Sequence, residues 1–170
     1  YAPSAAIVSP WEYALAMAEV AVRNGVELHL NSPVTHIEKT AGGWALTTPS
    51  GVVEARYVIN AAGVAADTIH DMAAPHKFTI QPTRGEYYLL DKSEGDRVHH
   101  VIFQCPNENG KGVLVSPTVH GNLIVGPDAV LVEGDDTACT AAGLAFVNAA
   151  ARRSVPGIRF GESIRNFAGV

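Results

Sequence analysis

The chain has 170 residues, enough for one or two domains, and 47% of them are hydrophobic, which is sufficient for a real core. Seventeen acidic residues against twelve basic ones give a formal charge of −5, which disfavours nucleic acid and anionic membrane surfaces as partners. No apolar run approaches the roughly 20 residues that span a bilayer.

The first part of the chain predicts a helix followed by a strand. Ser9 is suited to cap the helix, Pro10 to occupy its first position, and Glu12 to complete a capping box. Asn24-Gly25 supplies the stop signal. The clean alternation of residues 26–30 then predicts a strand. A helix joined to a strand by a short link is half of a βαβ unit.

The next segments predict a small antiparallel meander. Gly42-Gly43 and Pro49-Ser50-Gly51 are turn signals that separate three short β segments. The predicted strands cover residues 34–39, 44–48 and 52–55.

Residues 57–59 read as a strand buried on both faces, the kind found in parallel sheets, and 57–60 are expected to return the chain to the main sheet. Ala61, Ala62 and Gly63 put almost no side chain at its carboxyl end, where open α/β sheets bind ligands. A bulky cofactor could lie against the backbone there, although a tight strand-to-helix turn without a ligand is the alternative. A short helix over about 65–72 follows, and Pro75 ends this part.

From Phe78 the pattern changes to longer β segments, which predicts a second, largely antiparallel sheet. A helix over 135–151, capped by Asp136, follows it. Pro156-Gly157 breaks this helix, and residues 158–167 are expected to carry the chain back towards the first domain. The predicted strands of the second sheet cover 78–81, 86–91, 98–104, 113–116 and 123–125.

The cysteines and histidines indicate neither a disulfide nor a metal site. Cys105 and Cys139 are far apart and in no C-x-x-C pattern, which favours two buried free thiols in a cytoplasmic protein. The seven histidines show no Cys/His or H-E-x-x-H spacing, so we predict no bound metal. A G-x-S-x-G motif is lacking as well, which leaves nucleophilic catalysis without support.

Several of these segments resemble motifs of one family. Residues 57–67 resemble the second flavin-contacting motif of the D-amino-acid oxidase-like superfamily of FAD-dependent oxidoreductases. The later segments look most like the branch that contains anaerobic-type glycerol-3-phosphate dehydrogenases and L-2-hydroxyglutarate oxidases. The other segments that carry the resemblance, in family order, are 7–11, 32–38, 81–89, 111–122 and 125–129.

The resemblance implies an α/β (α+β) fold in three parts. Residues 1–74 would form part of a Rossmann-like FAD-binding domain with a β-meander, 75–155 a mainly antiparallel substrate-binding domain, and 156–170 a return segment to the FAD domain. The family opens with a strand and a G-x-G-x-x-G turn, and this sequence lacks that pattern. The chain therefore resembles an interior fragment of a larger enzyme, with the remainder of its own chain as a partner.

Two side chains are candidates for catalysis. Arg84 stands at the entry of the second sheet, where a guanidinium suits two-point capture of a substrate carboxylate or phosphate. Surface pairing of Arg84 with Glu86 or Asp91 is the alternative, and both stay open. His120 is a candidate base because an imidazole titrates near the working pH. A solvated turn residue beside Gly121-Asn122 is the alternative for His120.

The resemblance implies further site residues. In related flavoproteins the strand that precedes Pro117 runs beside the isoalloxazine ring, which makes its residues candidates to approach the substrate. A valine in the strand after the first helix contacts the adenine of FAD through its backbone, which points to Val34, although its side chain could equally be ordinary core. The candidates are Val115, Ser116 and Thr118 for the substrate, and Val34, Ala61, Ala62 and Gly63 for FAD.

The implied function is that of an FAD-dependent dehydrogenase or oxidase acting on a C–H bond beside a hydroxyl or amine. Arg84 and the branch favour a small anionic hydroxy substrate: glycerol 3-phosphate first, 2-hydroxyglutarate second and an amino acid third. Many relatives pass electrons to quinones or iron–sulfur partners, which leaves open a peripheral position at the inner membrane. Two alternatives remain: a substrate-binding fragment that cannot hold FAD alone, and a non-catalytic module that kept the fold.

Overall fold

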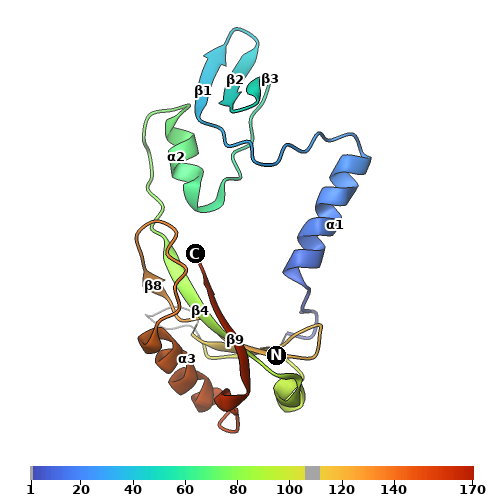
Figure 1. Ribbon diagram of the computed structural model, residues 1–170, viewed down its shortest axis with the longest axis vertical. Helices are drawn as coiled ribbons and strands as arrows, with labels where there is room; N and C mark the ends of the chain where they lie inside the picture. The colour runs from blue at the N-terminus through green and yellow to red at the C-terminus, as the bar shows by residue number, and fades with distance from the viewer. Residues whose placement is uncertain (1, 106–111) are drawn as a thin grey trace. The chain divides into compact units, whose positions relative to one another are not determined.

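A computed structural model describes residues 2–105 and 112–170 (Figure 1). Contacts divide the chain into two compact units: Tyr1–Met17 with Pro82–Val170, and Ala18–Gln81. The division before Pro82 falls a few residues after the boundary that we predicted at 74/75, where Ile80 is hydrogen-bonded to helix α2, and Tyr1–Met17, which we predicted in the first domain, group with the later unit. The mixed α/β class is confirmed, whereas the functional labels of the domains stay predictions.

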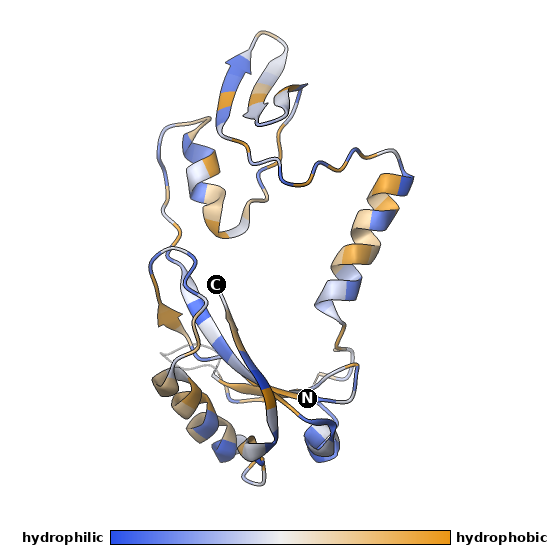
Figure 2. Cartoon of the chain, in the orientation of Figure 1, coloured by the Kyte–Doolittle hydropathy of each residue, from blue (hydrophilic) through white to orange (hydrophobic). Residues whose placement is uncertain are grey.

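Helix α1 (Pro10–Arg23) begins and ends where the sequence predicts. The backbone N–H of Glu12 donates to Oγ of Ser9 at 3.4 Å. At the other end, Gly25 adopts a φ of 89°, and the N–H of Val26 donates to the carbonyl of Ala21 at 3.1 Å. This is a Schellman stop, whose left-handed residue favours glycine. None of the side chains of α1 is buried by the described residues, although many are apolar (Figure 2).

The predicted meander is confirmed. Strands β1 (His36–Thr40), β2 (Gly43–Thr48) and β3 (Gly51–Ala55) pair antiparallel in that order. A Cβ at Gly43 would collide with the backbone carbonyl of Ala55, so only glycine lets the two strands approach there. A 3₁₀ turn, η1 (Gly63–Ala65), and helix α2 (Ala66–Asp71) follow, as the sequence predicts for a short helix.

Three other predicted strands are not formed within the residues that the structure describes: 26–30, 57–60 and 78–81. An extended segment becomes a strand only when it joins a ladder with a neighbouring strand, and none of the described ladders includes these three segments. Tyr57 and Ile59 are 87% and 90% exposed, so the burial expected on both faces is absent as well.

The second sheet is antiparallel, as predicted, with the strand order β5-β6-β7-β4-β8. Its central strand β4 also pairs with β9, from Gly85↔Gly169 to Leu90↔Ser163. Residues 163–169 were expected to return to the first domain, but this pairing and the stacked rings of Tyr87 and Phe167 place them in the antiparallel unit. The strands are β4 (Thr83–Leu90), β5 (Ile102–Phe103), β6 (Leu114–Pro117), β7 (Leu123–Gly126), β8 (Val130–Leu131) and β9 (Ser163–Gly169).

Helix α3 (Ala141–Ser154) covers one face of this sheet. Its cap is Thr140, whose Oγ1 accepts a hydrogen bond from the N–H of Gly143 at 3.0 Å. The predicted cap, Asp136, lies upstream and instead binds Arg84 and the N–H of Ala138. The core between helix and sheet consists mainly of aliphatic side chains: Leu90, Val98, Val113, Val115, Leu123, Val125, Val147, Ala150, Ala151, Ile158 and Phe160.

Two further expectations concern the thiols and membrane-spanning helices. Cys105 and Cys139 are free, as predicted, but both are exposed rather than buried, because each lies outside the core-facing positions of its unit. In the described part of the chain no helix combines the length and apolar character needed to cross a membrane.

A buried carboxylate at the edge of the core forms ion pairs with two arginines. Glu94, in the 3₁₀ segment η2 (Lys92–Arg97), is fully buried and accepts hydrogen bonds from Nη2 of Arg97 at 2.9 Å and Nε of Arg159 at 2.6 Å. Arg159 directly precedes the 3₁₀ turn η3 (Phe160–Glu162). The hydrogen bonds from Arg97, and then those from Arg159, lower the pKa of Glu94 to about 2, against an ordinary value of 4.5.

This pKa predicts a pH-dependent contribution to stability. Because the folded pKa lies below the unfolded one, the contribution is fully present above pH 4.5 and is lost as the pH falls towards about 2. We expect Glu94→Gln to lower the melting temperature at pH 7. The difference in melting temperature between this variant and the unsubstituted chain should shrink as the pH falls through that window. Thermal unfolding between pH 2 and 7 checks this, with the exposed Glu133→Gln as the control. A gap that stays constant with pH would contradict it.

Candidate functional site

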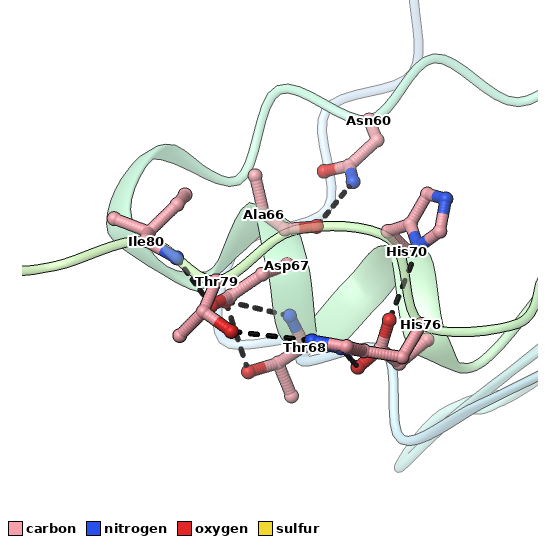
Figure 3. Close-up of polar contacts among 9 residues, drawn as sticks. Asn60, Ala66, Asp67, Thr68, His70, His76, Thr79 and Ile80 are labelled. Atoms are coloured by element: carbon pink, nitrogen blue, oxygen red, sulfur yellow. Dashed lines mark hydrogen bonds and ion pairs between the residues drawn. The ribbon is translucent and has the colours of Figure 1, made fainter.

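The turn of residues 60–66, in the unit Ala18–Gln81, presents bare backbone. Gly63 has a φ of 57°, in the left-handed region, and a Cβ placed on it would meet no atom of the described residues within 4 Å, its chain neighbours aside. Nδ2 of Asn60 donates to the carbonyl of Ala66 at 2.8 Å, as Figure 3 shows. Ala61, Ala62 and Gly63 are exposed, so the open approach to the backbone that we predicted is present, although no strand precedes it.

Helix α2, which follows the turn, is tied to residues 76–80 by two carboxylates (Figure 3). Oδ2 of Asp67 accepts from the N–H of Ile80 at 2.8 Å, and this bond is the main cause of the lowered pKa of Asp67. Asp71 contacts Nδ1 of His76 at 2.7 Å and Nδ1 of His70 at 3.1 Å, which lower the pKa of Asp71. The turn therefore leads into a helix whose side chains fix it to residues 76–80.

In the other unit, the face of the antiparallel sheet opposite helix α3 carries a groove of about 400 Å³. Side chains alternate across the strands, so residues next to the core residues face the groove. Leu89, Ser116 and Ile124 are register partners on this face. The segment before helix α1 contributes as well. The groove is lined by Ile7, Val8, Ser9, Pro10, Trp11, Leu89, Ser116, Pro117, Thr118, Val119, His120, Asn122, Ile124 and Phe167.

Apart from Ser9 and the indole of Trp11, the polar side chains that line the groove lie where β6 turns into β7. Ser116 is buried, and its hydroxyl donates to the carbonyl of Pro117 at 2.9 Å. Oγ1 of Thr118 accepts from the N–H of Asn122 at 3.0 Å, and Nδ2 of Asn122 donates to the carbonyl of Leu90 at 3.1 Å. His120 is exposed at this turn. Among the described residues that line the groove, His120 is the one ionisable side chain.

The structure brings together three of the four residues predicted near the substrate from 115–120. Ser116, Thr118 and His120 line the groove, but Val115 is fully buried in the core on the α3 side. Val115 pairs with Val125, and both point away from the groove because neighbouring residues of a strand alternate between faces. The prediction for Val115 is therefore wrong. Val34 is half-buried just before β1, and its contact with adenine stays a prediction.

Arg84 lies outside the groove, in a buried ion-pair cluster. Only 5% of Arg84 is exposed, and its guanidinium contacts Oε1 of Glu86 at 3.1 Å and Oδ2 of Asp136 at 2.7 Å. Arg84 therefore pairs with Glu86, as one of the two alternatives predicted, but the pair is buried and does not lie on the surface. Because two carboxylates already neutralise the guanidinium, the geometry does not support capture of a substrate anion by Arg84.

Sequence reasoning considered the pair Arg84–Glu86 but missed the burial of Glu86 and its other partners. Glu86 is fully buried and accepts from the N–H of Thr140 at 2.7 Å and from its hydroxyl at 2.8 Å. The N–H of Glu86 donates to Oδ1 of Asp128 at 2.7 Å. A Cβ at Gly143 would collide with the Glu86 carboxylate, so glycine there lets the first turn of α3 approach. The available signal was the pair Arg84 and Glu86, two residues apart and so on one face of a strand.

The cluster predicts the cost of truncating Arg84. We expect Arg84→Ala to lower the free energy of unfolding by about 3–5 kcal/mol, since it leaves the Glu86 carboxylate buried without its cation. Arg153→Ala, at an exposed arginine near the end of α3, is expected to change it by about 0.5 kcal/mol or less. Chemical denaturation of both variants measures the difference. Equally small changes in the free energy of unfolding of both variants would show that the ion pair of Arg84 and Glu86 does not stabilise the protein.

Comparison with known proteins agrees with the fold. The model of the family described as FAD dependent oxidoreductase matches residues 1–170. Glycerol 3-phosphate dehydrogenase of Caloramator mitchellensis is 47% identical over 171 residues, which is 100% of this chain and 36% of the relative. L-2-hydroxyglutarate dehydrogenase of Escherichia coli strain K12 is 32% identical over 135 residues, 77% of this chain and 32% of the relative.

Among solved structures, dithionite-reduced L-α-glycerophosphate oxidase from Mycoplasma pneumoniae with FAD bound superposes with a TM-score of 0.77. The sequence identity is 28%, and the match covers 92% of this chain and 42% of the oxidase. The chain thus spans less than half the length of each of these proteins.

Proposed function

Because the chain belongs to the family of FAD dependent oxidoreductases, we propose that it forms part of a flavoenzyme that oxidises glycerol 3-phosphate or a similar small anionic hydroxy compound. The observation that carries this proposal is the 47% identity to a glycerol 3-phosphate dehydrogenase along the whole chain. 2-Hydroxyglutarate is the second candidate, since a 2-hydroxyglutarate dehydrogenase is 32% identical over 77% of the chain. Both substrates carry a hydroxyl and a negative charge.

The 60–66 turn fits a bound FAD. Its exposed residues Ala61, Ala62 and Gly63 offer backbone without bulky side chains, and a Cβ on Gly63 would have no described residue beyond its chain neighbours within 4 Å. These three residues would lie against the cofactor, and Val34 would contribute its backbone. FAD, when bound, accepts the hydride, so the protein is left to bind, orient and exclude water.

The groove fits a role beside the reacting substrate. Its floor is mostly apolar, which excludes water, while the oxygens of Ser116 and Thr118 can exchange hydrogen bonds with a substrate hydroxyl. His120 can take the hydroxyl proton as the hydride leaves, provided that the substrate comes within hydrogen-bond distance of its ring. Arg84 has no part in this scheme because its charge is already paired.

Purified full-length protein tests the proposal directly. We expect it to be yellow and its flavin absorbance to bleach on anaerobic addition of glycerol 3-phosphate. Addition of 2-hydroxyglutarate, or of an amino acid such as glycine, in parallel samples ranks the alternatives. A protein that binds FAD but is reduced by none of these compounds would instead be a non-catalytic module.

A substitution at Gly63 tests the place of the cofactor. We expect Gly63→Val in the full-length protein to raise the FAD dissociation constant about tenfold or more, because the new side chain fills the approach to the turn and strains the backbone. The control is Gly134→Val, since Gly134 also has a positive φ, 64°, and open space around it. Fluorescence titration of the apoproteins with FAD measures both. If the two variants bind FAD equally well, FAD does not lie against Gly63.

A further inference from the structure

We propose that Asn60 is a positioning residue for the flavin: its side-chain amide holds the 60–66 turn in the shape that exposes the backbone of Ala61, Ala62 and Gly63. The inference rests on the proposed function, in which FAD lies against this turn. It assigns to Asn60 no direct contact with FAD or substrate.

Both groups of the Asn60 amide bind the main chain of the turn. Nδ2 donates to the carbonyl of Ala66 at 2.8 Å (Figure 3), and Oδ1 accepts from the N–H of Ala62 at 3.2 Å. The two bonded residues lie on either side of Gly63. One side chain therefore fixes the distance between the start of the turn and the first residue of helix α2.

Little else among the described residues holds the turn. Residues 61–65 are all exposed, so no core packing fixes them. The N-cap residues of η1 and α2, Ala62 and Ala65, carry no side chain that could bind the exposed N–H groups. Asn60 supplies the missing side-chain bond from outside the helix, at the N–H of Ala62.

The far side of the turn is already anchored. Asp67, one residue after Ala66, accepts from the N–H of Ile80, which fixes helix α2 against the segment that follows it. With α2 held there, the bond from Asn60 to Ala66 sets where the glycine lies relative to the helix. Without that bond the turn samples other shapes, and FAD must then order it on binding.

The experiment compares FAD binding by full-length apoprotein variants. We expect Asn60→Ala to raise the FAD dissociation constant roughly tenfold, because two hydrogen bonds of the turn are lost. Asn60→Asp keeps an acceptor for Ala62 but loses the donor to Ala66, so it should also weaken binding. We further expect altered visible circular dichroism of the bound flavin, since a misplaced turn changes the asymmetric surroundings of the ring.

Asn148→Ala is the matched control. Asn148 is partly exposed on helix α3, and its Oδ1 accepts from Nε of Arg152 at 2.8 Å, so this variant loses a side-chain hydrogen bond in the other unit. It should bind FAD as the unsubstituted protein does. A lowered apoprotein melting temperature in Asn60→Ala, with unchanged FAD affinity and flavin spectrum, would overturn the proposal. Failure of the unsubstituted full-length protein to bind FAD would instead overturn the proposed function on which it rests.

Discussion

The antiparallel unit depends on the buried carboxylate of Glu86. A fully buried charge is costly unless it is paired and hydrogen-bonded, and here Arg84 supplies the opposite charge and Thr140 two hydrogen bonds. Thr140 is also the N-cap of helix α3, where the unpaired N–H groups favour a negative charge. The carboxylate thus joins the central strand to the start of the helix. Asp128 extends the link by binding the N–H of Glu86.

The position of helix α3 decides where a ligand can approach the sheet. Because the helix covers the face that carries Leu90, Val115 and Val125, this face is filled by core. The opposite face carries Leu89, Ser116 and Ile124, and there the groove is found. Alternation along the strands therefore places one residue in the core and its neighbour at the groove.

In the unit Ala18–Gln81, the groups that shape the structure and those that are exposed to a ligand are separated in a different way. Its exposed turn offers backbone rather than side chains, which suits a large cofactor that must come close. Polar side chains around it, Asn60 before the turn and Asp67 after it, bind main-chain groups and so shape the surface without occupying it. Side chains that contact only other protein groups can therefore matter for cofactor binding as much as the residues that are proposed to contact the cofactor.

Local signals were readable from the sequence because a few adjacent residues contain their whole cause. Ser9 caps the first helix, Gly25 stops it, and glycines separate the strands of the meander, each through its own backbone preference or a bond to a near neighbour. The motifs of the family were likewise readable as short runs, and the match over residues 1–170 bears them out.

Features that need a distant partner were decided only in three dimensions. Residues 57–59 are apolar like a buried strand, yet an apolar run becomes a strand only when another segment pairs with it. Arg84 had two possible partners in the sequence analysis, and the actual ones include Asp136, on a loop far along the chain. Val115 and Ser116 look equally suited to a site, but only the side on which α3 packs makes one core and the other groove. The sequence determined the local elements and the family, and the tertiary contacts selected which side chains remain free for chemistry, because burial and charge pairing are properties of neighbours in space.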